Sequence, residues 1–202
     1  MAVFVGTRLG QRCEPGAICV VEGRLRTPDG HRCRFTHFTT RLIERLPPGT
    51  TFPEGAARVG EIVRNLSQKM RLRADVIVDA TGLGSPIVSL LESENLRVIA
   101  VYFNHGDRRI EEKNYEIRLG KAWLVARLQM LLQTQRLHLP ESPEARSLAK
   151  DLLDYQIDID PAANEKYGAF KVGAQDEMVT ALGLAVQADL SLGNPPTEYL
   201  LC

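Results

Sequence analysis

A short apolar run that is closely followed by a helix and a second apolar run places the strongest constraint on the fold of this chain. The segment VIVDA at 76–80 lies between charged residues and the sequence TGLG, as a buried strand does. Ser85 and Pro86 favour the start of a helix through IVSLLE, and RVIAVYF at 97–103 predicts another strand. Strand, helix and strand in this close succession indicate a parallel crossover unit, so we predict an α/β fold.

The residues before this unit predict a different strand arrangement. Apolar or β-branched residues often alternate in segments 2–5, 17–25 and 32–42, and PDG at 28–30 favours a turn between the last two. These segments predict a meander of three antiparallel strands. The segment 46–55, rich in Pro and Gly, predicts a loop. A helix follows it, with apolar residues at helical spacing, namely Ala56, Val59, Ile62, Val63 and Leu66.

The second half of the chain predicts helices that alternate with short extended segments. An amphipathic helix begins at Lys121, and a brief extended piece follows at 137–139. Another helix begins at 142–144, with an inner face of Leu148, Ala149, Leu152 and Leu153. An edge strand is expected at 156–160, then a glycine-bearing loop at 168–173 and a last helix from about Asp176, with Met178, Ala181, Leu182 and Ala185 inward. No internal repeat or linker interrupts the chain, so we expect one domain over 1–202.

Composition excludes little, because the 25 Lys and Arg residues balance 25 Asp and Glu residues. The first 74 residues are nevertheless net positive and the remainder is equally negative, which suggests a bipolar surface. No run approaches the roughly 20 apolar residues that cross a bilayer, and we expect a cytoplasmic protein with no membrane partner. The cysteines are too sparse for a disulfide framework and are expected to be free thiols: Cys13, Cys19, Cys33 and Cys202.

Three acidic residues stand at the ends of predicted elements, where they could bind a divalent metal. Asp79 closes an apolar strand, where burial is costly without a cation or hydrogen-bond donors. Asp176 and Glu177 open the last helix, whose positive end favours anions. Two-metal hydrolysis of phosphodiesters needs several carboxylates at one place, around ions about 3.5–4 Å apart. The alternatives are that Asp79 caps the following turn and that Asp176 and Glu177 are ordinary helix-start acids.

Five stretches resemble, in the same order, the nuclease domain of tailed-phage large terminases, the enzymes that cut concatemeric DNA during genome packaging. They are VFVGTRLGQRCEPGAICVVE at 3–22, VIVDATGLGSPIVSLL at 76–91, VYFNHGDRR at 101–109, IRLGKAWLVARLQMLLQTQRLHL at 117–139 and GAQDEMVTALGLA at 173–185. The resemblance implies an RNase H-like fold over 1–202, in which helices flank a central mixed sheet, an antiparallel meander followed by parallel strands. It also implies a cluster of divalent metal ions at one end of the sheet.

By this resemblance, Asp79, Asp176 and Glu177 are the catalytic and metal-binding residues, and the cofactor is Mg²⁺ or Mn²⁺. Lys121, at the head of the long helix, and Arg108 and Arg109, after the fifth strand, are candidates for contacts to DNA phosphates. The implied partners are double-stranded DNA and a terminase motor domain, small subunit or portal, in the cytoplasm of a host cell. The sequence has no G-x-x-x-x-G-K-[ST] phosphate loop, so no ATPase motor domain is expected within it.

One position departs from the family pattern. Terminase nucleases carry an aspartate two residues after the glycine that matches Gly6, whereas this chain carries Arg8. A guanidinium cannot coordinate Mg²⁺ and in practice keeps its proton, so Arg8 would compete with metal or pair with one of the acids. Glu14 matches a second acid outside the usual metal cluster and is not assumed to replace the missing one. Alternatively, the strand register differs and Arg8 points away.

Three hypotheses follow from these residues. The first is a metal-dependent DNA endonuclease for genome packaging, impaired by Arg8. The second is a catalytically inactive RNase H-like module for DNA binding or assembly, in which Arg8 pairs with Asp79 in place of a metal ion. The third is a nucleotide-binding protein in which G-x-x-x-G after the first strand and TGLG before a helix seat a phosphate. Trp123 is expected to be a packing residue rather than a platform for base stacking.

Overall fold

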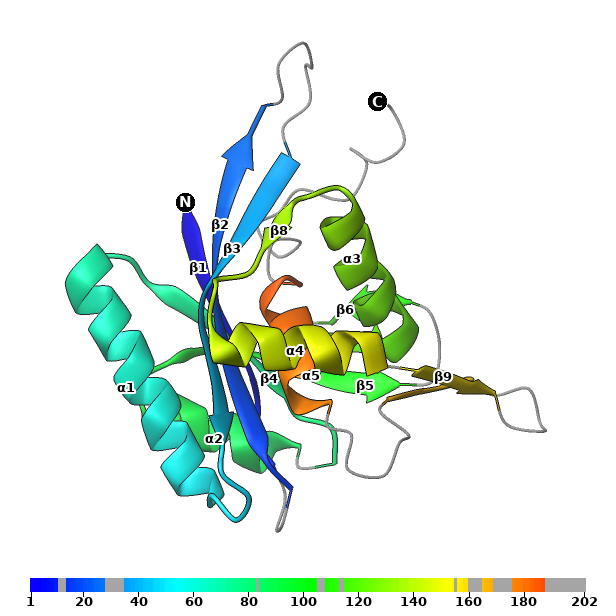
Figure 1. The fold of residues 1–202 in the computed structure, drawn as a ribbon. Coiled ribbons are helices and arrows are strands. Elements are labelled where there is room, and N and C mark those ends of the chain that lie inside the picture. Colours follow the sequence, from blue (N-terminus) through cyan, green and yellow to red (C-terminus); the bar gives the residue numbers. More distant parts are fainter. Residues whose placement is uncertain are drawn as a thin grey trace.

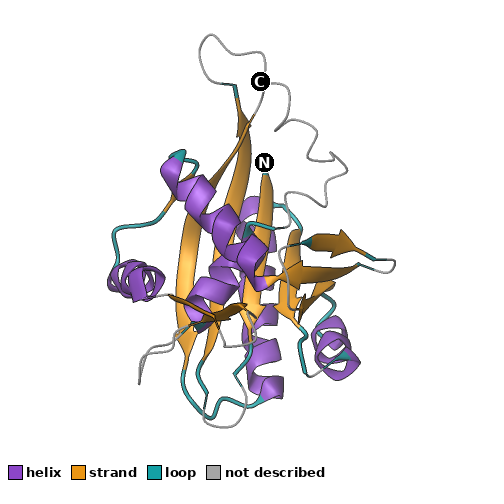
Figure 2. Cartoon of the chain, turned by 90° about the vertical axis from the view of Figure 1, so that its right-hand side faces the viewer, coloured by secondary structure: helices purple, strands orange, loops and turns teal. Residues whose placement is uncertain are grey.

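Helices and strands of this chain form a layered α/β structure around one large sheet. The structure is a computed structural model that describes residues 1–10, 14–27, 35–82, 84–104, 108–112, 115–154, 156–159, 165–168 and 176–187. The sheet has eight strands in the order β6-β7-β5-β4-β1-β2-β3-β8 (Figure 1). Figure 2, turned by 90°, shows how the helices pack on these strands.

The antiparallel part of the sheet comes from the first strands of the chain. β1 (Ala2–Arg8) pairs with β2 (Gly16–Arg26), and β2 pairs with β3 (Phe35–Leu46), both antiparallel. The short β8 (Leu137–His138) adds to β3 in parallel at one edge. The predicted three-stranded meander and the brief extended segment near 137–139 are therefore confirmed.

The parallel part of the sheet begins on the other side of β1. There β4 (Ala74–Asp79) pairs parallel with β1, and β5 (Arg97–Asn104) pairs parallel with β4. β7 (Glu116–Gly120) follows in parallel, and β6 (Arg109–Glu111) closes this edge antiparallel to β7. α2 (Ser85–Ser93) connects β4 to β5, which confirms the predicted crossover unit. β9 (Gln156–Ile159) and β10 (Glu165–Gly168) form a separate antiparallel pair.

Helices cover both faces of the large sheet and create two hydrophobic cores. On one face, α1 (Phe52–Met70) and α2 bury Val59 and Leu91 against side chains of β1, β2 and β4. On the other face lie α3 (Lys121–Gln133), α4 (Pro143–Asp154) and α5 (Glu177–Ala185). The predicted mixed sheet flanked by helices is confirmed. No helix among the described residues is long and apolar enough to cross a membrane.

α5 is the most deeply placed helix, and a glycine lets it come close to the sheet. Every residue of this helix is buried. A Cβ at Gly6 of β1 would lie 2.0 Å from the carbonyl oxygen of Ala181 and 2.6 Å from the backbone nitrogen of Ala185. Only a residue without a side chain permits this approach. The same packing brings the start of α5 beside the end of β1.

Some element boundaries and faces differ from the sequence predictions. α1 begins at Phe52 inside the segment predicted as a loop, because Thr51 and Glu54 form a capping box and Pro53 occupies the first turn. The two short strands β6 and β7 were not predicted, since each offers few residues for a period-2 pattern. Leu153, predicted to face inward, is 86% exposed, and Leu132 is 38% exposed. Leu148 is buried as predicted, and Ala145, which was not predicted, is buried beside it on α4.

Several predictions fall wholly or partly on residues that the structure does not describe. They are the 28–30 turn, the start of the third strand at 32–34, most of the 168–173 loop and Cys13, Cys33 and Cys202. Cys19 is described and is a free, buried thiol in β2. Burial raises the pKa of this thiol to about 12, so it is a core residue and not a reactive one.

We predict that Gly6→Ala destabilises the protein by about 3 kcal/mol, because the new methyl group must push α5 away from β1. Urea denaturation measures the change in the free energy of unfolding. Gly23→Ala in β2 is the matched control, since its Cβ meets nothing nearer than a side-chain atom of Phe4 at 3.1 Å. Equal stabilities for the two variants would contradict this account of how α5 docks.

Candidate functional site

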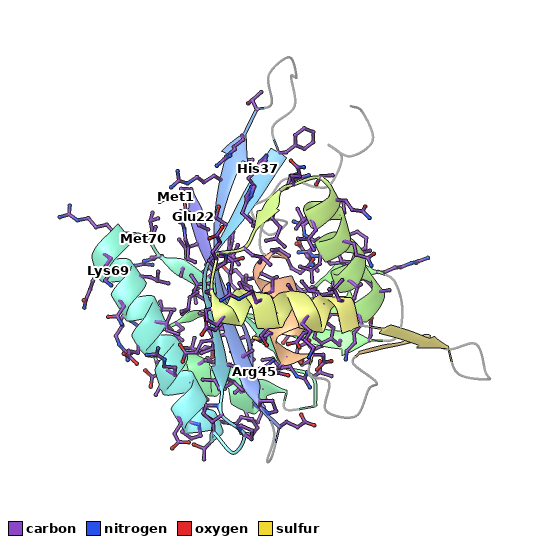
Figure 3. The ribbon with its side chains drawn as sticks, in the orientation of Figure 1. Met1, Glu22, His37, Arg45, Lys69 and Met70 are labelled. Atoms are coloured by element: carbon purple, nitrogen blue, oxygen red, sulfur yellow. The ribbon has the colours of Figure 1, made fainter. Side chains whose placement is uncertain are left out.

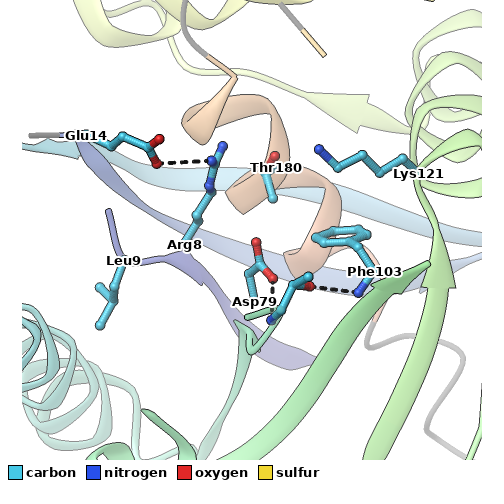
Figure 4. A pocket seen from close by; sticks show the side chains of 8 residues that line it. Arg8, Leu9, Glu14, Asp79, Phe103, Lys121 and Thr180 are labelled. Atoms are coloured by element: carbon cyan, nitrogen blue, oxygen red, sulfur yellow. Dashed lines mark hydrogen bonds and ion pairs between the residues drawn. The ribbon is translucent and has the colours of Figure 1, made fainter. Parts of the chain in front are cut away.

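A pocket of about 190 Å³ opens where β1, β4 and β5 end, beside the start of α3 (Figure 4). Parallel strands that end together at one edge of a sheet are a common place for functional side chains. Eight residues line the pocket: Arg8, Leu9, Glu14, Asp79, Thr81, Phe103, Lys121 and Thr180. Three of them, Arg8, Asp79 and Lys121, were predicted as site residues from the sequence.

Arg8 lies at the centre of this pocket and connects acids from different parts of the chain. Its Nη1 donates a short hydrogen bond to Oδ1 of Asp176, and its Nη2 lies 3.6 Å from Oε2 of Glu14. Burial alone would lower the pKa of Arg8, but Asp176, Asp79 and Glu14 together raise it above its ordinary value. The guanidinium is therefore a fixed positive charge that points into the site. The alternative in which Arg8 points away does not hold.

Asp79 ends β4 and is held by the turn that follows it. Its Oδ1 accepts a hydrogen bond of 2.9 Å from the backbone N–H of Thr81. The hydroxyl oxygen of Thr81 in turn accepts a hydrogen bond of 2.8 Å from the backbone N–H of Phe103 on β5 (Figure 4). Asp79 thus caps the turn with one oxygen and also faces the pocket. Arg8 lines the same pocket, and the charge of Asp79 helps to raise the pKa of Arg8.

Asp176 immediately precedes α5 and lies between two cations. Besides Arg8, the Nζ of Lys121 lies 3.9 Å from its Oδ2. Lys121 is the first residue of α3, and its Nζ also lies 5.8 Å from the centre of the Phe103 ring. The side chain of Lys121 is 37% exposed, whereas that of Asp176 is 19% exposed. Lys121 therefore reaches both Asp176 and the solvent at the mouth of the pocket.

Glu177 does not join this cluster, although it follows Asp176 directly. The helix turns its side chain toward β3, where its Oε1 lies 2.7 Å from Nε of Arg45. Arg45 also pairs with Asp151 of α4 through a hydrogen bond of 2.8 Å. Burial raises the pKa of Glu177, and Arg45 offsets only part of this effect. Of the two adjacent acids, Asp176 is the one that the fold brings to Arg8.

The two predicted phosphate-binding arginines lie outside the pocket. Arg109 on β6 pairs with Glu111, and its side chain is only 10% exposed. Arg108 precedes β6 and is exposed. Trp123, in the first turn of α3, is partly buried and packs against the core, which agrees with a packing role.

The residues at this site do not fit the two-ion cluster that the resemblance implies. In the part of the chain that the structure describes, no three His, Cys, Asp or Glu side chains form a group that could hold a metal ion. Mg²⁺ needs a near-octahedral set of oxygen ligands, whereas Arg8 donates into the carboxylate that would supply one of them. The positive charge at this place is supplied by the chain itself.

The fold has close counterparts among solved structures. The large terminase nuclease of thermophilic phage G20c with bound magnesium is 17% identical, with a TM-score of 0.65 over 92% of this chain and 80% of that chain. The manganese-soaked terminase nuclease domain of human cytomegalovirus is 12% identical, with a TM-score of 0.55 over 92% and 82%. The chain has the fold of the large-terminase nuclease domains. No protein-family model and no curated protein matches the sequence.

A comparison with a longer protein defines which part of a terminase this fold corresponds to. The large terminase of bacteriophage HK97 is 15% identical, with a TM-score of 0.56, and the match covers 93% of this chain but 39% of that one. The similarity is thus to the terminase nuclease domain. The RNase H-like nuclease fold expected from the five sequence stretches is confirmed by these neighbours.

Three residues that line the pocket were missed from the sequence, namely Thr81, Phe103 and Thr180, and so was Arg45 beside Glu177, each for a physical reason. Thr81 lies in the stretch VIVDATGLG, but its hydrogen bond with the backbone of Phe103 depends on the position of β5 beside this turn. Phe103 and Thr180 look like ordinary core residues at helical or strand spacing. Arg45 gave no sequence signal, since its partners Glu177 and Asp151 are distant in the chain.

We predict that the stability difference between the wild type and Glu177→Gln depends on pH. The folded carboxyl holds its proton to higher pH than its ordinary value of 4.5, so ionisation disfavours the folded state. The wild type should therefore lose stability relative to Glu177→Gln as the pH rises above the ordinary value of 4.5 and through the raised pKa of the folded carboxyl. Urea denaturation at several pH values measures this difference. Glu141→Gln, at an exposed position, serves as the control, and a constant difference for Glu177→Gln would refute the burial argument.

Proposed function

We propose that this chain is a terminase-type nuclease domain that binds double-stranded DNA without cutting it, because Arg8 takes the place of the metal ions. The observation that supports this function best is the contact of Arg8 with Asp176 and Glu14 in the pocket, with Asp79 close enough to interact. In this proposal, residues 1–202 act as one domain. A separate motor domain supplies ATP-driven translocation, and a small subunit or portal completes the assembly.

The charge balance of the pocket supports this proposal. An aspartate at position 8 would add a negative charge to those of Asp79, Asp176 and Glu14, which favours a divalent cation. Arg8 instead adds a positive charge and reduces the attraction for a metal ion. It also lowers the repulsion that a DNA phosphate would meet. Lys121 at the mouth of the pocket is then the residue placed to contact that phosphate.

A second candidate is the metal-dependent DNA endonuclease, and one specific observation favours it. Asp79 lines the pocket, Asp176 binds Arg8 of its lining, and solved structures of the G20c and cytomegalovirus nucleases of this fold carry magnesium and manganese. In this reading, Asp79 with Asp176 or Glu177 would hold Mg²⁺ or Mn²⁺. The bound ions would supply an activated water and stabilise the leaving oxygen. Arg8 would first have to leave Asp176.

We predict that Arg8→Asp creates a site for Mn²⁺. Replacing the guanidinium by a carboxylate frees Asp176 and adds an oxygen ligand, so Mn²⁺ affinity should rise about tenfold or more. Isothermal titration calorimetry measures binding, and nicking of supercoiled plasmid measures cleavage. The wild type should bind Mn²⁺ weakly and nick little or no DNA, while Arg8→Asp should nick it.

Two control variants make this result interpretable. Arg73→Asp makes the same charge change at an exposed position outside the pocket and should not create a metal site. Adding Asp79→Asn to Arg8→Asp should abolish the gained binding. Rapid plasmid cleavage by the wild type that Asp79→Ala removes would overturn the proposal in favour of the endonuclease. An Arg8→Asp protein that is folded but binds no Mn²⁺ would show that position 8 is not part of a latent metal site.

We predict that Lys121→Ala weakens binding to duplex DNA and reduces its salt dependence. Each phosphate contact contributes about one unit to the slope of log affinity against log salt, so the slope should fall by about one. Fluorescence anisotropy at several salt concentrations measures the slope. Lys69→Ala, on the exposed end of α1 away from the pocket, is the control (Figure 3). Identical slopes for the wild type and Lys121→Ala would exclude a phosphate contact by this side chain.

A further inference from the structure

A second pocket, of about 540 Å³, lies at the opposite end of the sheet from Arg8. It is lined by Arg26, Thr27, Phe35, His37, Thr134, Gln135 and Arg136, and we call it the Arg26–Arg136 pocket. Arg8 pairs with Ala17 on β2, and Arg26 is nine residues further along the same strand. At about 3.3 Å per residue, the two sites are about 30 Å apart. Figure 3 shows His37 at this end of β3 and Arg45 at the other.

The described lining residues of the Arg26–Arg136 pocket are basic, polar or aromatic, and none of them carries a carboxylate. Arg26 and Arg136 carry fixed positive charges, and among the described residues neither is paired with an Asp or Glu. Arg136 is only 7% exposed, and a buried charge without a counterion is costly. The charge of these described side chains favours an anionic ligand.

Arg136 is held in a defined orientation. Its Nε donates a hydrogen bond of 3.0 Å to the carbonyl oxygen of Thr36, and its guanidinium lies 5.0 Å from the centre of the Phe35 ring. These contacts use one edge and one face of the guanidinium. The two terminal nitrogens remain as a fork of the kind that binds phosphate oxygens.

The histidines beside Arg136 also lie in a positively charged environment. His37 stacks on His138 of β8, with ring centres 5.8 Å apart and planes 10° apart. The Nδ1 of His37 is buried and has no hydrogen-bond partner among the described residues. Burial lowers the pKa of His37, and the charges of Arg26, His138 and Arg136 lower it further. A bound anion would relieve this repulsion.

The end of α3 does not oppose an anion here, although helix C-termini normally repel negative charge. Its last carbonyl groups accept backbone hydrogen bonds from residues of the following turn. Thr134 donates to Met130 at 3.0 Å, Gln135 to Leu132 at 3.0 Å and Arg136 to Leu131 at 2.8 Å. These acceptors are therefore occupied within the turn.

From this geometry, we propose that the Arg26–Arg136 pocket binds the phosphate of a nucleotide, either free or within a DNA strand. The arginine forks and His37 bind the phosphate oxygens. The volume exceeds what a phosphate alone fills and lies in the range of small-ligand sites, so it also admits a sugar or base. Phe35, Thr134 and Gln135 provide an aromatic face and polar groups for that part of the ligand. This site is independent of the function proposed for the Arg8 pocket.

Calorimetric titrations with three probes test this proposal: inorganic phosphate, 2′-deoxyadenosine monophosphate and a short single-stranded DNA. The wild type should bind the nucleotide or the DNA more tightly than inorganic phosphate. Arg26→Glu, which changes an exposed side chain, should weaken this binding about tenfold or more. Arg136→Lys keeps the charge but loses the fork and should weaken it too. The NMR signals of the His37 ring should shift when the ligand binds.

A matched control variant tests the specificity of this site. Arg73→Glu, at an exposed position outside both pockets, should leave nucleotide binding unchanged. Binding of the DNA alone identifies a strand as the source of the phosphate, and binding of the mononucleotide identifies a free nucleotide. Equal affinity for inorganic phosphate would overturn the nucleotide assignment. Absence of binding by all three probes, or binding that a folded Arg26→Glu protein retains in full, would overturn the site.

Discussion

The ion pair between Arg8 and Asp176 is the interaction on which the chemistry of this molecule depends. A divalent metal ion accepts oxygen ligands from several directions and tolerates a water or phosphate among them. A guanidinium instead donates hydrogen bonds along directions fixed in its own plane and cannot accept any. With Arg8 bound to Asp176 and lying close to Glu14, the negative charge of these carboxylates is balanced in part by the chain itself. The chain has the fold of the terminase nucleases with an arginine at this place.

This ion pair exists because α5 packs directly on the backbone of β1. Gly6 permits that approach, and the start of the helix then lies beside the end of the strand, where Arg8 stands. The same geometry separates two adjacent acids. Asp176, before the first turn of the helix, meets Arg8, while Glu177 turns toward Arg45 on β3. Of these two acids, which are adjacent in the sequence, Asp176 thus binds Arg8 of the pocket and Glu177 makes a buried structural contact.

The sequence predicts the fold well and the site only in part. The period-2 segments and the strand–helix–strand unit are strong local signals, and both match the structure. The capping box of Thr51 and Glu54 is a recognisable signal for a helix start, but it lies within a Pro- and Gly-rich segment that was predicted as a loop. Asp79 was found because it closes an apolar strand, whereas Arg8 was found only from its departure from the terminase pattern two residues after Gly6. The contact of Glu177 with Arg45 could not be found, since Arg45 meets Glu177 and Asp151 only through the packing of α4 and α5 against β3.

The uneven distribution of charge along the sequence also has a structural explanation that differs from a simple bipolar surface. Arginines of the basic first part pair with acids of the acidic second part across layers of the fold, as Arg8 does with Asp176 and Arg45 does with Glu177. Part of the charge asymmetry is therefore neutralised by ion pairs inside the molecule. These ion pairs connect the first strands to the last helices. The cations that matter for recognition are those that such pairing leaves without a carboxylate. Among the described residues, Arg26 and Arg136 are two of these, and both line the same pocket at one end of the sheet.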